Sequence, residues 1–177
     1  MAATAISHEQ LSNDLLEKVW HELRQVTDPE LPVLNIVEMG LVRKVYAQVT
    51  GADPTSRVEV VITPTFSGCP ALAVIEENVS AAIRKTGADD VQVTTRLSPP
   101  WSTDDMTDEA RHKLEKFGIA PPAPHGGLLQ IALEAPVSCP RCGHPDTLLR
   151  NAFGSTLCRE IRTCQGCQET FERFKPL

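Results

Sequence analysis

The chain has 177 residues, 41% of them hydrophobic, which is enough for one ordinary domain with a packed core and a small second unit. No apolar run approaches the roughly 20 residues that span a bilayer, and the first residues lack the basic and apolar regions of a signal peptide, so we expect a protein of the reducing cytoplasm. The formal net charge is −6, and the six Lys and Arg of residues 136–177 are scattered rather than clustered, which argues against nucleic-acid binding.

Two main helices are predicted in the first part of the chain. Apolar residues at spacings of three and four indicate an amphipathic helix over 13–26, with Ser12 or Asn13 as its N-cap. Asp28 precedes a proline and therefore avoids the helical conformation, so the helix ends there. A second amphipathic helix is predicted over 70–85, and it opens on a proline, which is favoured at the first helical position.

Alternating apolar residues predict three strands, over 41–49, 58–63 and 91–97. The first two strands are joined across 51–54, where glycine and proline indicate a turn. Helix, two strands, helix and strand in this order predict a small α/β (α+β) domain with a mixed sheet.

A helix and a linker are predicted between this domain and the C-terminal part of the chain. Pro-Pro-Trp at 99–101 ends the sheet domain, and Ser102 or Thr103 can cap a polar helix over 105–117. Residues 118–127 are rich in proline and glycine, which is typical of a linker. The resulting division is a sheet domain over 1–100, a helix and Pro/Gly linker over 101–134, and a C-terminal unit over 135–177.

The C-terminal unit carries two Cys-x-x-Cys motifs, Cys139-Pro-Arg-Cys142 and Cys164-Gln-Gly-Cys167. Each motif turns back on itself and presents two sulfurs to one side, and four sulfurs complete the tetrahedron that zinc prefers. Twenty-one residues separate the motifs, enough for a β-hairpin, so we predict a β zinc ribbon with one structural zinc. Two disulfides or free thiols are the alternative, and four thiolates would also suit iron.

Other residues of this unit are expected to pack around the metal. Phe153, Phe171 and Phe174 are predicted to form the small core of the ribbon, which depends on metal to fold. Cys158 lies outside both motifs, and we expect it to pack in that core or to replace one ligand. His144 follows the first motif and is expected to be exposed, because four cysteines already fill the site.

Cys69 is the candidate functional thiol of the sheet domain. It lies in a strand-to-helix turn just before a helix N-terminus, where unpaired amides and the helix dipole favour a thiolate and would lower its pKa. Such a thiolate serves as a nucleophile or as a soft metal ligand; the alternative is a small buried hydrophobe. Asp28 and Glu30 flank a rigid proline and are candidates for acid, base or hard ligand, or for simply solvated carboxylates.

Several segments together resemble known families. DPELPVLNIVEMGL (28–41), TPTFSGCP (63–70) and PPW (99–101) are similar to the small domain of SufT-type and related cytosolic iron–sulfur assembly factors. The whole chain, including FGSTLCR (153–159) and FERFK (171–175), resembles the PaaD family, also called PaaJ, of the bacterial phenylacetate degradation pathway. One departure is Asp105, where the family pattern leads us to expect an aromatic residue.

The resemblance implies an accessory protein of the multicomponent phenylacetyl-CoA epoxidase, concerned with maturation of metal centres. In this hypothesis Cys69 matches the cysteine of the family and Asp28 and Glu30 its acidic motif, and together they hold iron or an iron–sulfur cluster transiently. The reductase or another oxygenase component would be the client, and the ribbon would dock it. A homodimer that bridges two such cysteines is left open.

Two other hypotheses remain beside it. In the first, the chain is a structural adaptor subunit, both units only bind partners, and Cys69 is a core residue. In the second, a Cys-x-x-Cys pair makes the protein a thiol oxidoreductase. This is disfavoured because redox pairs usually begin a helix in a thioredoxin-like setting, whereas these motifs come as two and flank hairpin turns.

Overall fold

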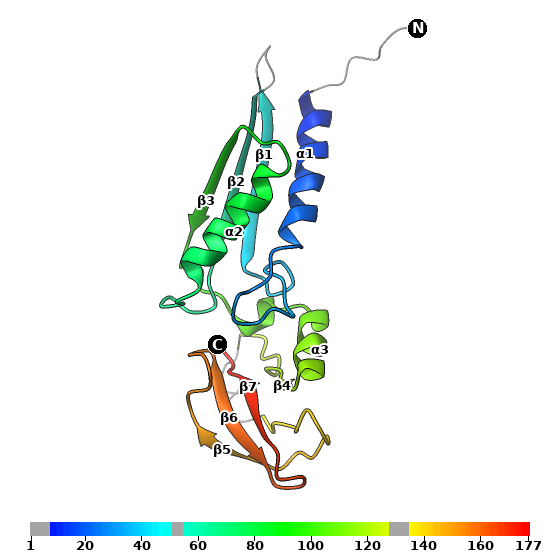
Figure 1. The fold of residues 1–177 in the computed structure, drawn as a ribbon, viewed down its shortest axis with the longest axis vertical. Coiled ribbons are helices and arrows are strands. Elements are labelled where there is room, and N and C mark those ends of the chain that lie inside the picture. The colour runs from blue at the N-terminus through cyan, green and yellow to red at the C-terminus, as the bar shows by residue number, and fades with distance from the viewer. Residues whose placement is uncertain (1–7, 51–54, 128–134) are drawn as a thin grey trace, which may run out of the picture.

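A helix-and-sheet unit and a smaller sheet unit lie end to end in the computed structural model of the chain (Figure 1). The structure describes residues 8–50, 55–127 and 135–177, so the turn predicted across 51–54 lies outside the described residues. In the part of the chain that the structure describes, no helix is long and apolar enough to cross a bilayer.

The first unit contains the predicted mixed sheet of three strands. They are β1 (Val42–Thr50), β2 (Thr55–Ile62) and β3 (Asp90–Thr95), in the spatial order β1-β2-β3. β1 and β2 are antiparallel, as suits strands only four residues apart in the chain, whereas β2 and β3 are parallel and are connected through a helix. The α+β class and the mixed sheet are therefore confirmed.

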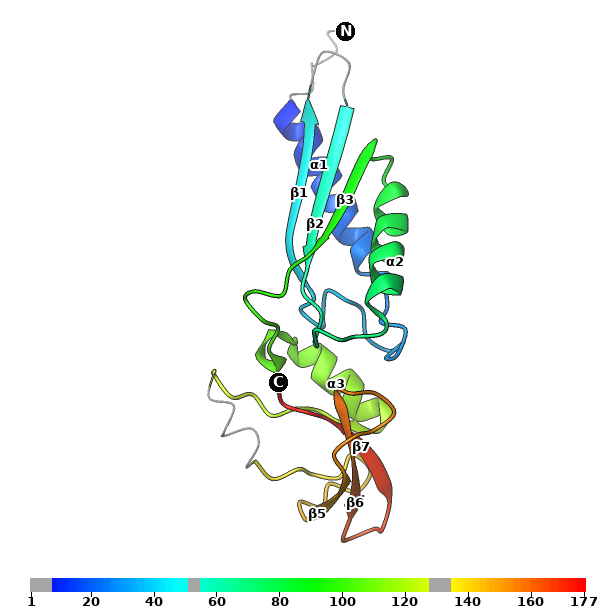
Figure 2. The same ribbon diagram turned by 90° about the vertical axis from the view of Figure 1, so that its left-hand side faces the viewer.

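Two helices, α1 (His8–Leu23) and α2 (Leu72–Arg84), cover one face of this sheet (Figure 2). α1 begins earlier than predicted, so Ser12 lies within the helix; its hydroxyl does not cap the helix but accepts a hydrogen bond from the Val49 amide at 3.0 Å. The buried apolar side chains of both helices pack on the inner face of the sheet, and the helical ones include Val19, Leu23, Ile75, Val79 and Ile83.

A packed loop, residues 24–41, connects α1 to β1. Asn35 Oδ1 accepts from the amides of Val37 and Glu38 at 3.0 and 2.9 Å, and Glu38 Oε1 accepts from the Asn35 amide at 2.8 Å. This reciprocal pair has the bonding pattern of a capping box. Glu38 also accepts from Lys113 Nζ at 2.7 Å, which ties the loop to α3 (Asp108–Phe117), a helix much later in the chain.

The polar helix predicted over 105–117 is divided in two. A 3₁₀ turn, η1 (Thr103–Asp105), is capped by Ser102, and α3 (Asp108–Phe117) begins after it with Thr107 as its cap. Asp105, where an aromatic was expected, accepts from the Ser102 amide at 2.9 Å and pairs with Arg43 at 2.8 Å. A Cβ on Gly40, which has φ +73°, would lie 2.3 Å from the Asp105 carbonyl oxygen, so the loop approaches η1 closely.

The second unit is a four-stranded sheet with the order β4-β7-β6-β5. Its strands are β4 (Ile119–Ala120), β5 (Thr147–Asn151), β6 (Arg159–Cys164) and β7 (Thr170–Phe174). β5, β6 and β7 form the antiparallel ribbon that the two cysteine motifs predicted. β4 comes from the segment predicted as a linker and pairs in parallel with β7. Its two apolar residues are buried, Ile119 in the core of the first unit and Ala120 in the small core of the ribbon.

The aromatic core predicted for the ribbon is only partly correct. Phe171 is buried with Ala120 and Val137 in a small core beside the cysteines. Phe174 is instead buried in the core of the first unit, with its ring centroid 6.0 Å from that of Trp101. Phe153 is 59% exposed, and Lys175 Nζ lies 5.0 Å from its ring centroid. Phe171 and Phe174 stand at an odd spacing in one strand and so lie on its opposite faces, which explains why they enter different cores.

Backbone and side-chain hydrogen bonds reinforce this junction. The Thr103 amide donates to the Leu177 carbonyl at 3.0 Å, and Trp101 Nε1 donates to the Met39 carbonyl at 2.9 Å. The end of the chain is therefore anchored at Thr103, next to Trp101, which ties the last strand of the ribbon to the first unit.

We predict that this shared core makes the two units unfold together. Phe174→Ala removes a fully buried ring and should lower the free energy of unfolding by about 3–5 kcal/mol in urea denaturation of the zinc-loaded protein. Phe153→Ala is the matched control in the same unit and should change it by less than about 0.5 kcal/mol, since that ring is exposed. Equal effects of the two variants would contradict the placement of Phe174.

Candidate functional site

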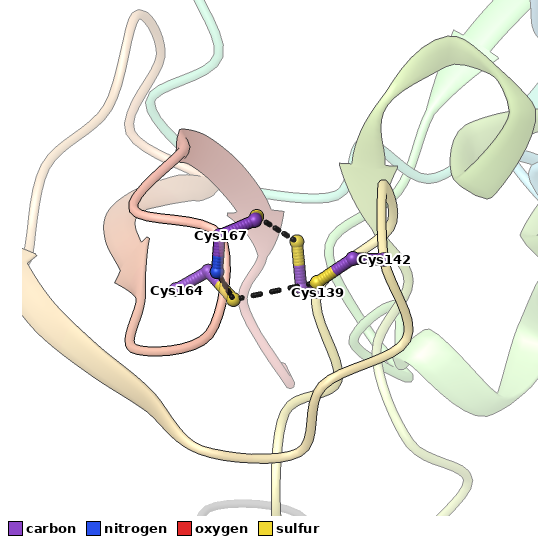
Figure 3. A group of neighbouring side chains, drawn as sticks. All are labelled: Cys139, Cys142, Cys164 and Cys167. Carbon is purple, nitrogen blue, oxygen red and sulfur yellow. Dashed lines mark hydrogen bonds between the residues drawn. The ribbon is translucent and has the colours of Figure 1, made fainter.

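The structure brings the four cysteines of the two Cys-x-x-Cys motifs into one cluster (Figure 3). All four Sγ atoms lie within 4.8 Å of one another, with Cys139 and Cys167 at 3.8 Å and Cys142 and Cys164 at 3.6 Å. A tetrahedral ion with Zn–S bonds of about 2.3 Å needs sulfurs about 3.8 Å apart. The spacing and the donor type therefore fit a closed structural zinc site.

The two motifs adopt matching turns. The Gly143 amide donates to the Cys139 carbonyl at 2.8 Å, and the Gln168 amide donates to the Cys164 carbonyl at 3.1 Å. The residue after each second cysteine has a left-handed backbone, with φ 74° at Gly143 and 62° at Gln168. Glycine adopts this conformation without strain, whereas glutamine does not, so the turn at Gln168 is held by the structure around it.

The electrostatics of the cluster call for a cation. The Cys167 amide, and after it the Gly166 amide, donate to Cys164 Sγ and lower the pKa of Cys164 to about 6. The Glu169 amide acts to lower the pKa of Cys167. The neighbouring thiols of Cys142 and Cys164 act in the opposite direction, and the pKa of Cys167 is raised to about 12. Four thiolates thus repel one another unless a divalent ion lies among them.

His144 stays outside this ligand set, as predicted. Its side chain is exposed, and Nδ1 accepts a hydrogen bond from the Asp146 amide at 3.2 Å. The ring packs over Gly166, where an added Cβ would lie 2.8 Å from it. The ring therefore lies against the second cysteine turn.

Cys69 lies in the turn before α2, at the end of the first unit that faces the ribbon. Its amide donates to the Phe66 carbonyl at 3.1 Å, and its carbonyl accepts from the Leu72 amide at 3.3 Å. α2 begins at Leu72 after Ala71, so Cys69 precedes the first helical turn instead of lying in it. The thiol is partly buried against the core.

The prediction of a lowered pKa at Cys69 was wrong. Burial raises the pKa of the Cys69 thiol, and this outweighs the Ala71 amide, which acts to lower it. The negative charges of Asp28 and Glu30, and that of Cys158 when ionised, raise it further. The predicted carboxylates do lie near Cys69, and their charge adds to the effect of burial, which together favour the protonated thiol.

Asp28 supports the loop around the thiol. It is buried, and its Oδ1 accepts from the amides of Glu30 and Leu31 at 2.8 and 2.9 Å. Burial raises the pKa of Asp28, although these two amides and the charge of Arg159 act to lower it. Asp28 therefore orders the turn that carries Glu30, which is itself only partly buried.

Cys158 is the residue that the sequence placed incorrectly. It belongs neither to the four-cysteine cluster nor to the ribbon core, but packs against the core of the first unit. It lines one small cavity, of about 10 Å³, together with Cys69 and Glu30. Burial raises the pKa of the Cys158 thiol as well. The sequence has no motif or spacing that relates Cys158 to Cys69. Its one signal was that both cysteines lie outside the two Cys-x-x-Cys motifs.

Comparison with protein families divides the chain in the same way. Residues 16–95 match the family described as iron-sulfur cluster assembly protein. Residues 125–175 match the family described as PaaD zinc beta ribbon domain. The first match contains Cys69 and both carboxylates, and the second contains the four clustered cysteines and Cys158.

Individual proteins are similar over larger parts of the chain. A protein of Escherichia coli (strain K12), named as a putative subunit of 1,2-phenylacetyl-CoA epoxidase, is 39% identical over 160 residues, which is 90% of this chain and 92% of that protein. The crystal structure of a domain of unknown function, DUF59, from Bacillus anthracis is 27% identical, with a TM-score of 0.52, over 60% of this chain and 96% of that one. A conserved hypothetical protein from Thermotoga maritima is 35% identical over 58% of this chain and 93% of that one, with a TM-score of 0.45.

We predict that zinc divides the six cysteines into two classes. In the zinc-loaded protein iodoacetamide should spare the four clustered cysteines and modify only Cys69 and Cys158, slowly at pH 7 and faster as the pH rises, because burial raises both thiol pKa values. After chelation all six should react. Mass spectrometry of peptides reports each site. Reactive Cys142 or Cys167 in the zinc-loaded protein would contradict the closed site and favour the thiol oxidoreductase hypothesis.

A second prediction separates the structural from the chemical role of Asp28. Asp28→Asn keeps an oxygen for the two amides and should fold at least as stably as the parent at pH 7, whereas Asp28→Ala should lose about 0.5–2 kcal/mol. Because the folded pKa of Asp28 is raised, its contribution to stability is present at low pH and is lost as the pH rises through that pKa. The advantage of Asp28→Asn in urea denaturation should therefore grow from acid to neutral pH, and a constant difference would refute this.

Proposed function

Because this chain belongs to the PaaD family, we propose that it is an accessory protein of a multicomponent phenylacetyl-CoA epoxidase that assists assembly of an iron–sulfur or other iron centre. The name of the Escherichia coli relative supports the link to the epoxidase, and the match to an iron–sulfur cluster assembly family supports the maturation role. In this proposal the protein acts in the cytoplasm on its client, the reductase or another oxygenase component.

The observation that carries this proposal is the position of Cys69 beside Asp28 and Glu30, at the end of the first unit that faces the ribbon. A thiol is a soft ligand and a carboxylate a hard one, and iron accepts both. The four ribbon cysteines would complete the coordination of one zinc by themselves, so Cys69 is not needed as a ligand there. We therefore assign iron or a cluster to the Cys69 region as transient cargo.

The ribbon has a different task in this proposal. One zinc held by Cys139, Cys142, Cys164 and Cys167 would order the second unit, whose own apolar core is small. This rigid unit would dock the client component while the first unit presents the cargo. Zinc thus serves the fold and takes no part in the transfer.

One observation favours the alternative, a structural adaptor without metal transfer. Burial raises the pKa of Cys69, so the metal-free thiol stays protonated at neutral pH and resembles a small apolar side chain. In the adaptor hypothesis the ribbon alone matters, and changing Cys69 has no effect on the client.

We predict that Cys69→Ser lowers the iron and acid-labile sulfide content of the client while leaving this protein folded. The measurement is metal and sulfide analysis of the epoxidase reductase component, purified anaerobically from cells that produce each variant in place of the parent protein. The expected loss is at least about tenfold, since a cargo ligand is removed. Ser67→Ala, an exposed change two residues away, is the matched control and should leave the client full.

The outcomes separate the two functions. A client with full iron content in Cys69→Ser cells would end the maturation proposal. If a zinc-ligand variant such as Cys164→Ser then abolished growth on phenylacetate while Cys69→Ser did not, the adaptor function would be the one supported.

A further inference from the structure

The sheet of the first unit carries a pocket of about 410 Å³ on the face that α1 and α2 leave uncovered, which is turned toward the viewer in Figure 2. This volume lies within the roughly 300–1,000 Å³ of small-molecule sites. Its walls come from β1, β2 and the segment that follows β3, and include Arg43, Lys44, Glu59, Val61, Thr63 and Arg96. The pocket shares no lining residue with the cavity at Cys69, so it is a separate feature of the molecule.

The register of the three strands brings these side chains together. Lys44 on β1 pairs with Val61 on β2. The Arg96 amide donates to the Ile62 carbonyl at 2.9 Å, so Arg96 continues β3 beside Thr63. Ile62 belongs to the core beneath the helices, and its neighbours Val61 and Thr63 therefore point to the opposite face of the sheet.

The floor of the pocket holds polar groups that are buried without a partner. Val61 is 5% exposed yet belongs to neither apolar core. Thr63 is 2% exposed, and its Oγ1 has no hydrogen-bond partner in the part of the chain that the structure describes. Arg43 Nε is buried and unpaired in the same way, although Nη2 of that side chain donates to Asp105 Oδ2 at 2.8 Å. Because burial of an unpaired donor is unfavourable, both groups favour an acceptor that enters the pocket.

The charges at the rim of the pocket have the sign that suits such an acceptor. Lys44 and Arg96 are exposed, and neither forms an ion pair with a described residue. The charge of Arg43 is offset by Asp105, and Glu59 is the carboxylate among the lining residues. Two unpaired cations beside two unpaired donors form the kind of site that binds an oxyanion, on a chain whose formal net charge is −6.

We propose that this pocket binds a small organic anion, with the carboxylate or phosphate group of the ligand between Lys44 and Arg96 and hydrogen-bonded by the Thr63 hydroxyl. Glu59 lies farther along the outward face of β2, in register with Tyr46. Its carboxylate can accept a hydrogen bond from a hydroxyl or amino group of the same molecule, and it disfavours a second anionic group. The proposal goes beyond the maturation function and does not depend on it.

The test is a titration of the full, zinc-loaded chain, followed by the backbone amide signals in two-dimensional ¹⁵N–¹H NMR spectra. Inorganic phosphate and acetate are the first probes, at a constant ionic strength of about 0.15 M, so that screening stays the same. Phenyl phosphate and benzoate then present the same two anions on an apolar ring. Saturable shifts are expected at residues 43–46, 61–63 and 96–98, and the ring should tighten binding because Val61 offers an apolar floor.

A charge-matched pair of variants separates this site from the net charge of the protein. Arg96→Gln should weaken binding of the preferred probe at least about tenfold, since hydrogen bonds to charged groups are the strong ones. Arg84→Gln makes the same change on the exposed side of α2, across the sheet from the pocket, and should bind as the parent does. Cys69→Ser should also bind as the parent does, which keeps the result independent of the maturation assay.

Thr63→Val distinguishes a ligand contact from a merely structural role. The change removes the hydroxyl and keeps the shape of the side chain, so it should weaken binding about two- to tenfold. The melting temperature of the ligand-free protein should not fall, because the hydroxyl has no partner there. Glu59→Gln should instead tighten the binding of inorganic phosphate, since it removes a negative charge from the pocket.

The expected result is saturable binding that Arg96→Gln and Thr63→Val weaken and Arg84→Gln does not, with the stronger of the two anion types identifying the ligand class. Absence of saturable shifts with all four probes would overturn the proposal. Equal losses in Arg96→Gln and Arg84→Gln would also overturn it, because net charge alone would then explain the binding. Unchanged affinity in Thr63→Val would refute the assigned position of the anion.

Discussion

The insertion of the last strand into the first unit is the contact on which the rest of the structure depends. Phe174 packs against Trp101 in a core that belongs to the sheet domain, and the Leu177 carbonyl accepts from the Thr103 amide. A ribbon with a core of its own this small would otherwise swing freely on its connection. The buried aromatic pair instead fixes its orientation, and thereby decides which ribbon residues face Cys69.

The cysteines inside and outside the four-sulfur cluster differ in their surroundings, which shift the thiol pKa values in opposite directions at Cys164 and at Cys69 and Cys158. In the ribbon, amides point at Cys164 and lower its pKa, and four sulfurs at tetrahedral spacing call for a permanent ion. At Cys69 and Cys158, burial raises the pKa of each thiol and so favours the protonated form. The four-sulfur cluster is therefore suited to holding the fold together, whereas a protonated thiol such as Cys69 must lose its proton before it can bind the transient cargo that we propose.

Asp28 illustrates how structure and chemistry are combined in one loop. Its side chain accepts hydrogen bonds from two backbone amides, which the side-chain oxygen of an asparagine could also do. The chain nevertheless has a carboxylate here, although burial disfavours the charged form of this group. When ionised, Asp28 acts on its surroundings: its charge adds to the effect of burial in raising the pKa of Cys69. The carboxylates of this loop and the Cys69 thiol beside it are therefore electrostatically coupled.

The sequence by itself determined the features that depend on local spacing. Two Cys-x-x-Cys turns predict a four-sulfur site because each turn is complete within a few residues, and the alternation of apolar residues predicts the mixed sheet and its helices. The pKa of Cys69 was predicted in the wrong direction, since burial and the charge of distant residues outweigh a helix that begins only at Leu72. The site of Cys158 was decided by tertiary structure alone: nothing near it in the chain indicates that Phe174 enters the other core, and only that packing carries the thiol to Cys69.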